Sequence, residues 1–159
     1  MSADLLVSML LSFIPVSEVR GGIPYGYFTG LPLAQVVPLC MLGNMVVPVF
    51  AWAFLATLHR WFYAHWNWYR MKFEKFLEKT RKKVQPSVEK YGFWGLMVFV
   101  AIPLPMTGAW TGAGAAWLLG IEKHKALLAI VLGIIIASGI VTGVLLGGSS
   151  VGSIFIKRV

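Results

Sequence analysis

A carboxylate and a guanidinium stand two positions apart in the apolar sequence IPVSEVRGGIPYGYFTG, which covers residues 14–30. These side chains, Glu18 and Arg20, are the only Asp, Glu, Lys or Arg residues between Leu5 and His59. A charged side chain in a membrane interior costs roughly 3 kcal/mol on insertion scales unless it is paired or hydrated. Glu18 could take up and release a proton there, and Arg20 could hold an anionic group or clamp Glu18. The pair therefore predicts a coupled binding site near the membrane midplane, and the alternative is an ion pair that only holds the chain together.

Three uncharged polar side chains complete the candidate site. Asn44 lies in an apolar segment, where it could line the same cavity or form an interhelical hydrogen bond that caps the hairpin. Ser17 precedes Glu18, and Thr107 is the only polar side chain in a second break of the chain. Hydroxyls of this kind commonly bond to carbonyl groups of their own helix. The predicted substrate and coupling residues are Glu18, Arg20, Asn44, Ser17 and Thr107.

No enzymatic chemistry is indicated elsewhere in the chain. The sequence contains no nucleophile elbow, no cluster of histidines with carboxylates, and no phosphate-binding glycine loop followed by lysine. Cys40 is the only cysteine, which excludes an intrachain disulfide and argues against a thiolate metal site. The histidines, His59, His65 and His124, lie at segment ends as interfacial residues do. We expect no enzyme, no cofactor and no metal.

Composition indicates an integral membrane protein. Of the 159 residues, 58% are hydrophobic and only 13% are charged, and the mean hydropathy is +0.75. Neither Tyr91–Ile121 nor Ala126–Ile156 contains Asp, Glu, Lys or Arg, and a helix needs about 20 apolar residues to cross a bilayer. The opening residues lack the basic start and the small-residue cleavage site of a signal peptide. We therefore expect a multi-pass protein of the cell membrane, that is, the inner or plasma membrane.

The chain divides into four apolar segments, of which Leu33–Leu58 and Ala126–Gly148 predict membrane-spanning helices. The other two, Leu5–Gly30 and Tyr91–Gly120, each begin with about a dozen apolar residues, enough for a helix of about 16 Å, or half the hydrocarbon thickness. Prolines and glycines then interrupt both segments, so we expect re-entrant hairpins. Four full crossings would give the same balance of basic residues across the membrane and are the alternative. The residues of the predicted breaks are Pro15, Gly21, Gly22, Pro24, Gly26, Pro103, Pro105 and Gly108.

The two halves of the chain resemble each other. Broken hydrophobic segments in corresponding positions are typical of transporters built from inverted repeats. We predict an all-α membrane fold in which each repeat is a re-entrant hairpin followed by a transmembrane helix. The single membrane domain, 1–159, comprises repeats at 1–59 and 91–159 and a linker at 60–90. Ile14-Pro15 matches Ile102-Pro103 at an offset of 88, and Gly22, Gly30 and Leu42-Gly43 match Gly112, Gly120 and Leu132-Gly133 at an offset of 90.

The linker carries most of the positive charge. Residues 60–90 contain nine Lys and Arg residues, which predicts that this segment lies in the cytoplasm. Apolar residues recur at helical spacing from Tyr69 to Val84, and aromatic rings crowd the preceding sequence RWFYAHWNWY. This pattern favours an amphipathic helix on anionic headgroups over a solvated linker or a nucleic-acid site. The lysines expected at the membrane surface are Lys72, Lys75, Lys79, Lys82 and Lys83.

Two motifs carry a family resemblance. SFIPVSEVRGGIPYGYFTGLP and, about 90 residues later, FVAIPLPMTGAWTGAGAAWLLGI resemble the small multidrug export protein family over nearly the whole chain, with SEVRGGIPYG as the most specific part.

More distantly, VRGGIPYGYFTGLPL is similar to the proline- and glycine-rich membrane-dipping motif of the DedA (VTT-domain) superfamily. In that superfamily paired re-entrant hairpins dip into the membrane from opposite sides, and members are implicated in moving lipids or anionic lipid carriers. The resemblance implies a transporter fold with Glu18 and Arg20 at the charged positions of the motif. The second break lacks a charged residue, which departs from the DedA pattern and weakens the carry-over of a two-charge site for lipid phosphate.

These observations together predict a proton- or ion-coupled secondary transporter with its site at a broken hairpin. The expected substrate is a small amphiphile or drug-like compound, or an anionic lipid headgroup. The expected partners are the lipid bilayer with its anionic headgroups and a second copy of the chain in a homodimer, and no nucleic acid. The alternative is a protein that organises lipids or partners through its basic amphipathic helix without transporting anything.

Overall fold

A computed structural model describes residues 2–75, 78, 82, 92–104 and 107–156, and every regular element in these ranges is a helix. The predicted all-α class is therefore confirmed. A helical stretch at 67–75 follows α5. The bounds are α1 Ala3–Phe13, α2 Glu18–Phe28, α3 Leu33–Met45, α4 Val47–Ala56, α5 Leu58–His65, α7 Phe93–Ala101, α8 Ala109–Leu118 and α9 Lys123–Ile156.

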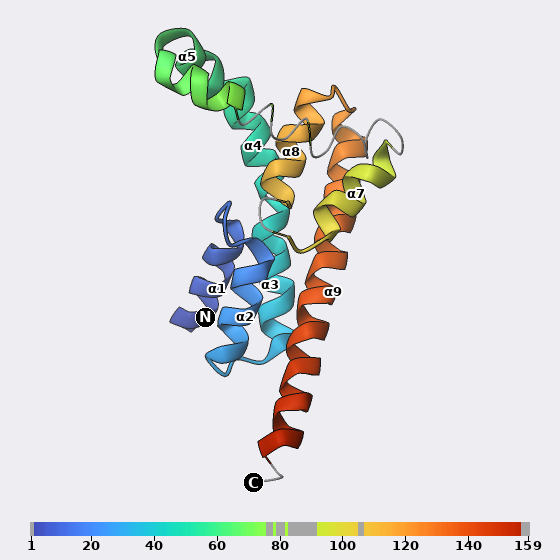
Figure 1. Cartoon of the computed structure of the whole chain (residues 1–159). Helices are drawn as coiled ribbons and strands as arrows, with labels where there is room; N and C mark the ends of the chain where they lie inside the picture. Colours follow the sequence, from blue (N-terminus) through green and yellow to red (C-terminus); the bar gives the residue numbers. More distant parts are fainter. Residues whose placement is uncertain (1, 76–77, 79–81, 83–91, 105–106, 157–159) are drawn as a thin grey trace.

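Two long apolar helices run side by side through the middle of the molecule, and α9 extends beyond the start of α3 (Figure 1). The first joins α3 and α4 over Leu33–Ala56, and the second is the Lys123–Gly148 part of α9. Their lengths of 24 and 26 residues and mean hydropathies of 1.9 and 2.6 are sufficient for a helix to cross a membrane. α3 ends and α4 begins around Val46, because the ring nitrogen of Pro48 has no hydrogen to donate to the Asn44 carbonyl.

Two pairs of short helices pack against these long helices. α1 and α2 form one hairpin with its turn at 14–17, and α7 and α8 form the other with its turn at 102–108. In Figure 1 the hairpins approach from opposite ends, and their turns lie next to each other at mid-height. With 11 and 9 residues, α1 and α7 are only about 14 to 16 Å long. Each hairpin therefore extends over only part of the length of the long helices.

The first turn is shorter than the sequence suggested. Pro15 lies in the turn as predicted, but α2 begins at Glu18 and continues without interruption to Phe28. In the second turn, Pro103 and Gly108 lie outside the helices as predicted, and Pro105 lies outside the described residues. The prediction that the helix breaks was wrong for four positions inside α2, which are Gly21, Gly22, Pro24 and Gly26.

Close packing explains why α2 contains glycines. A Cβ at Gly22 would lie 2.0 Å from Ser12 Oγ, and a Cβ at Gly26 would lie 2.6 Å from Val36 Cγ1. These distances are far below van der Waals contact, so only glycine lets α1 and α3 approach the α2 backbone this closely. Neighbouring helices thus offset the weak helix propensity of this segment.

A second close contact of a glycine occurs at matching positions in the two halves of the chain. A Cβ at Gly43 would lie 2.9 Å from the Met9 carbonyl oxygen, and a Cβ at Gly133 would lie 2.8 Å from the Met97 carbonyl oxygen. Gly133 follows Gly43 by 90 residues, and Met97 follows Met9 by 88 residues. These are the same offsets that relate the matching sequence motifs. Glycines with positive φ also end α2 and α8 at matching positions, Gly30 at +79° and Gly120 at +67°.

The described part of the linker lies at one end of the molecule, next to the turn from α8 to α9 (Figure 1). His59 is only 6% exposed, and its ring centre lies 4.1 Å from that of Phe73, 5.8 Å from that of Tyr69 and 5.8 Å from that of Trp117. Because Trp117 belongs to α8, these rings hold the stretch at 67–75 against the end of the second hairpin. Tyr69 and Phe73 are partly buried, as the apolar side of an amphipathic helix requires. Of the predicted surface lysines, Lys72, Lys75 and Lys82 are exposed, and Lys79 and Lys83 lie outside the described residues.

Candidate functional site

Glu18 is the only Asp, Glu, Lys or Arg residue that is buried in the described part of the chain, with 3% of its surface exposed. It is the first residue of α2 and has φ +50°, a conformation that costs a residue other than glycine about 1–3 kcal/mol. Its Oε1 accepts a hydrogen bond from the Trp110 backbone N–H at 3.3 Å, and the Ala109 N–H also faces the carboxylate. These N–H groups are at the start of α8, where they have no partner within the helix. Glu18 therefore caps a helix of the other hairpin, with its negative charge at the positive end of the helix dipole.

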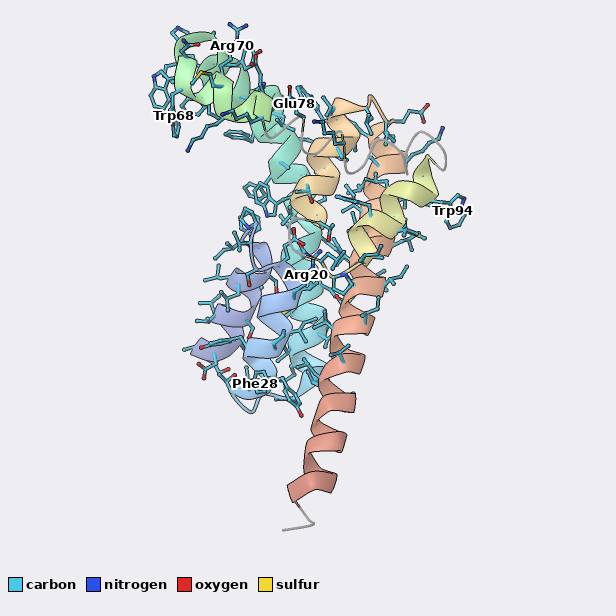
Figure 2. The ribbon with its side chains drawn as sticks, in the orientation of Figure 1. Arg20, Phe28, Trp68, Arg70, Glu78 and Trp94 are labelled. Atoms are coloured by element: carbon cyan, nitrogen blue, oxygen red, sulfur yellow. The ribbon has the colours of Figure 1, made fainter. Side chains whose placement is uncertain are left out.

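Arg20 binds the turn that leads into the same helix (Figure 2). Its guanidinium donates to the carbonyl oxygens of Leu104 and Thr107, the latter at 2.6 Å, and lies 3.5 Å from the carbonyl oxygen of Ile102. Thr107 Oγ1 accepts a further bond from Arg20 at 3.0 Å and lies 2.8 Å and 2.7 Å from the Ile102 and Leu104 carbonyl oxygens. Carbonyl groups at the end of α7 lack partners within the helix and carry the negative end of its dipole. Of these acceptors only the Ile102 carbonyl belongs to the cap of α7, and the others lie in the turn, so Arg20 binds the turn as a whole, whereas Glu18 caps the start of α8.

Glu18 and Arg20 form only a loose ion pair with each other. Their closest atoms, Oε2 and Nη2, are 3.9 Å apart, farther than the bonds that each makes to the second hairpin. Both charges lie beside the turn of their own hairpin, at the start of α2, and the groups that they bind belong to the turn of the other hairpin. The hydroxyl of Thr107 contacts Arg20. The hydroxyl of Ser17 instead lies over its own helix, 1.9 Å from where a Cβ at Gly21 would be.

Trp110, which belongs to the second hairpin, in turn donates a side-chain hydrogen bond to the first hairpin. Its indole Nε1 donates to the carbonyl oxygen of Phe13, the last residue of α1, at 2.7 Å, and the two rings pack edge-on with centres 5.6 Å apart. Trp110 follows Arg20 by 90 positions, so the two donors occupy matching places in the two hairpins. Trp110 was not among the predicted site residues, although the offset that relates Gly22 to Gly112 could have identified it. We refer to Glu18, Arg20, Thr107 and Trp110 as the hairpin junction.

Two buried polar atoms at the junction have no hydrogen-bond partner among the described residues. Asn44 is 1% exposed, its side-chain amide faces the Glu18 carboxylate, and its Oδ1 is unpartnered. Arg20 Nε is likewise unpartnered. Buried polar groups rarely lack partners, so the junction retains one acceptor and one donor that a bound polar group could use. It can hold a proton on Glu18 and an anionic or hydrogen-bonding group beside Arg20.

The chain matches a family model over residues 18–140, a range that begins at Glu18 and includes the whole second hairpin. The family is described as "Putative small multi-drug export protein". The chain belongs to this family. Together with the two helices long enough to cross a membrane, family membership indicates a membrane protein of a transporter-like family. No curated protein and no solved structure shows significant similarity to the chain.

Proposed function

We propose that the protein is a proton- or ion-coupled secondary transporter whose site is the hairpin junction. The observation that carries this proposal is that Glu18 and Arg20, from one hairpin, bind the free N–H and C=O groups at the turn of the other. Ionisable groups within a membrane usually belong to substrate or ion pathways. Broken helices that meet near the midplane form the sites of many secondary transporters. The description of the family, which names export, favours the same function.

The proposed fold consists of two inverted repeats, each a re-entrant hairpin followed by a spanning helix, in the inner or plasma membrane. The hairpins approach from opposite ends (Figure 1), and their first helices are about half as long as the hydrocarbon core is thick. The matching contacts of Gly43 and Gly133 also support this fold. A distant relationship to the DedA superfamily is part of the same proposal. The end that holds α5 and the α8–α9 turn then faces the cytoplasm, because the basic residues gather there.

Protonation of Glu18 is the step that we expect to couple ion movement to a conformational change. The ionised carboxylate accepts bonds from the start of α8 and attracts the Arg20 guanidinium. A neutral carboxyl group loses the charge-assisted part of these bonds and its attraction to the helix dipole. The two hairpins then separate more easily, and the polar group of a substrate can pair with Arg20 and Asn44. Release of the substrate and the proton restores the closed junction.

The substrate class that fits this chemistry is a small amphiphile or drug-like compound, or an anionic lipid headgroup. Its polar group pairs with Arg20 or Glu18, while its apolar part remains among the aliphatic side chains around the junction. Two hairpins and two spanning helices form a thin bundle for enclosing a hydrated cavity, so we also propose a homodimer. A strictly monomeric species in both mild detergent and bilayers would contradict the dimer.

The linker supports a second candidate function. Trp61, Trp66 and Trp68 are 55%, 52% and 62% exposed, and Lys72 and Lys75 beside them are exposed as well. Exposed tryptophans and lysines are typical of surfaces that lie at the level of anionic headgroups. A protein with such a surface can organise lipids or partners without moving a substrate.

Transport into liposomes distinguishes the two functions. The purified protein is reconstituted, a pH gradient is imposed, and the accumulation of a fluorescent organic cation and of a lipid phosphate is measured in parallel. Glu18→Gln should abolish gradient-driven accumulation, and Glu122→Gln, at an exposed carboxylate, is the matched control. If neutralising the exposed linker lysines abolishes function and Glu18→Gln does not, the second function replaces the first.

A further inference from the structure

A second site lies at the end of the molecule where both long helices stop. A cavity of about 240 Å³ lies between α4, α8 and the start of α9. Ala56, which lines it, is the last residue of one membrane-capable helix, and Lys123, which also lines it, is the first residue of the other. The cavity therefore lies where the apolar part of the molecule meets its charged end. Its other walls include Trp52, Ala116, Trp117 and Ile121.

The walls of this cavity are held by contacts between helices. Trp52 Nε1 donates to the Ala113 carbonyl oxygen at 3.1 Å, which fixes the indole of α4 against α8. Trp117 packs edge-on against His59, with ring centres 5.8 Å apart. Gly120, with φ +67°, ends α8 and directs the chain into α9. Two fixed indoles with small residues between them form a preformed apolar slot.

The mouth of the slot carries a positive charge that no described carboxylate neutralises. Lys125 forms an ion pair with Glu122 at 3.0 Å. Lys123, by contrast, has no carboxylate within salt-bridge distance among the described residues and lines the cavity. It also belongs to the first turn of α9, where free N–H groups add positive potential. The mouth of the slot thus favours an anionic group, while the interior favours a hydrocarbon chain.

We propose that this slot binds an anionic phospholipid, with the phosphate at Lys123 and the upper part of one acyl chain between Trp52 and Trp117. Tryptophan is enriched at the headgroup level of membranes, and basic residues there attract anionic lipids. A cavity of 240 Å³ is smaller than the pockets of about 300–1,000 Å³ that hold drug-sized ligands, whereas one acyl chain is narrow enough to enter it. The proposal rests on the membrane location of the protein and is independent of transport at the hairpin junction.

Native mass spectrometry of the full chain in mild detergent tests this site. The protein is titrated with phosphatidylglycerol and, separately, with phosphatidylcholine. We expect one phosphatidylglycerol molecule to bind in preference to phosphatidylcholine, and Lys123→Gln to weaken its binding about fivefold. Lys125→Gln is the matched control. It removes the same charge two residues along the chain, but Lys125 is already paired with Glu122.

A second pair of variants tests the apolar part of the slot. Ala56→Leu fills the slot without changing charge and should also weaken phosphatidylglycerol binding, whereas Ala53→Leu, at an exposed residue of α4 that does not line the cavity, should not. Glycerol 1-phosphate, a headgroup without chains, should fail to displace the bound lipid. The proposal is overturned if Lys123→Gln and Lys125→Gln bind phosphatidylglycerol equally or if phosphatidylcholine binds as tightly. It is also overturned if Ala56→Leu retains full binding or if glycerol 1-phosphate displaces the lipid.

Discussion

The carboxylate of Glu18 occupies the space that a side chain at Gly108 would fill. A Cβ at Gly108 would lie 1.9 Å from Glu18 Oε2 and 2.7 Å from Glu18 Cδ. Gly108 follows Glu18 by 90 positions, the same offset that relates Gly22 to Gly112. Two matching residues can touch each other only where they lie close to the axis that relates the two copies. A contact between Glu18 and Gly108 is therefore expected near the pseudo-two-fold axis of the inverted repeats that we propose.

Replacing Gly108 with alanine should disrupt the junction. The backbone there has φ +131°, which L side chains rarely adopt, so the added methyl group strains the chain by about 1–3 kcal/mol and also displaces the carboxylate. We expect a lower thermal midpoint and loss of gradient-driven transport in liposomes, with the protein still inserted. Gly92→Ala is the matched control, because Gly92 has φ +52° and a Cβ there meets no described residue within 4 Å. Retained transport in both variants would contradict a role for this contact.

Replacing Trp110 with phenylalanine tests the hydrogen bond that the second hairpin donates to the first. Phenylalanine keeps most of the packing on Phe13 but cannot donate to its carbonyl oxygen, so the free energy of unfolding should fall by about 1 kcal/mol. Trp52→Phe is the control, because it removes a similar bond, to the Ala113 carbonyl oxygen, away from the junction. Thermal unfolding should be affected similarly in both variants, and transport should fall only in Trp110→Phe. An unchanged transport rate in that variant would show that the bond is structural.

Much of the fold could be predicted from composition alone. Long segments without charges must become helices in a membrane, because a helix satisfies its own backbone hydrogen bonds. The position of the first turn could not be predicted in this way. Glycine and proline weaken an isolated helix, but Gly22 and Gly26 are inside α2 because α1 and α3 pack against their backbone. Tertiary packing therefore outweighed local propensity in this segment.

The partners of Glu18 could not be predicted for a different reason. Its partner in α8 is the backbone N–H of Trp110, and the Ala109 N–H also faces it, but no pattern of side chains marks a free N–H. Only the location of the second break indicated that such groups exist. Applying the offset of 90 to Arg20 would have identified Trp110 and hence the reciprocal contact.

We predict that Lys123 and Lys75 face the same side of the membrane. The stretch at 67–75 packs on Trp117, next to the turn from α8 to α9 (Figure 1). Single cysteines at these positions, in a Cys40→Ala background, can be labelled with an impermeant thiol reagent in vesicles of known orientation. Thr29→Cys, at the exposed end of α2, should be labelled from the opposite side. Labelling of positions 75 and 123 from opposite sides would rule out the hairpin topology.

The buried ring of His59 predicts how the linker responds to acid. Burial lowers the pKa of His59 below its usual value of 6.5, so the docked linker disfavours the protonated ring. Well above that pH the His59 ring is neutral in both the docked and the undocked state, so pH does not change docking through this residue. As the pH falls below about 6.5, the undocked ring takes up a proton first, so docking against Trp117 weakens. Hydrogen–deuterium exchange in residues 58–75, corrected for intrinsic rates, should therefore increase between about pH 7 and pH 5.

Two histidine variants check this assignment. His59→Gln is neutral at every pH and should remove the increase in exchange. His65→Gln, at an exposed ring on the same helix, should retain it. Burial raises the pKa of Tyr69 further above its usual value of 10, away from this range, and the Nδ1 of His59 lies 3.1 Å from the Tyr69 hydroxyl. The same increase in His59→Gln as in the wild type would mean that another group controls docking.

Variants of the charge pair test coupling most directly. Glu18→Gln keeps an acceptor for the Trp110 N–H but removes the titratable carboxylate, so accumulation driven by a pH gradient should vanish while passive exchange of substrate persists. Arg20→Gln leaves the buried Glu18 carboxylate without its nearby cation and frees the carbonyl groups of the turn, so both stability and transport should fall. The double variant strands no charge and should therefore recover part of the lost stability without recovering coupling. Thermal unfolding and liposome flux at matched pH gradients measure the two effects separately. A folded double variant that responds to the gradient as the wild type does would show that the coupling group lies elsewhere in the chain.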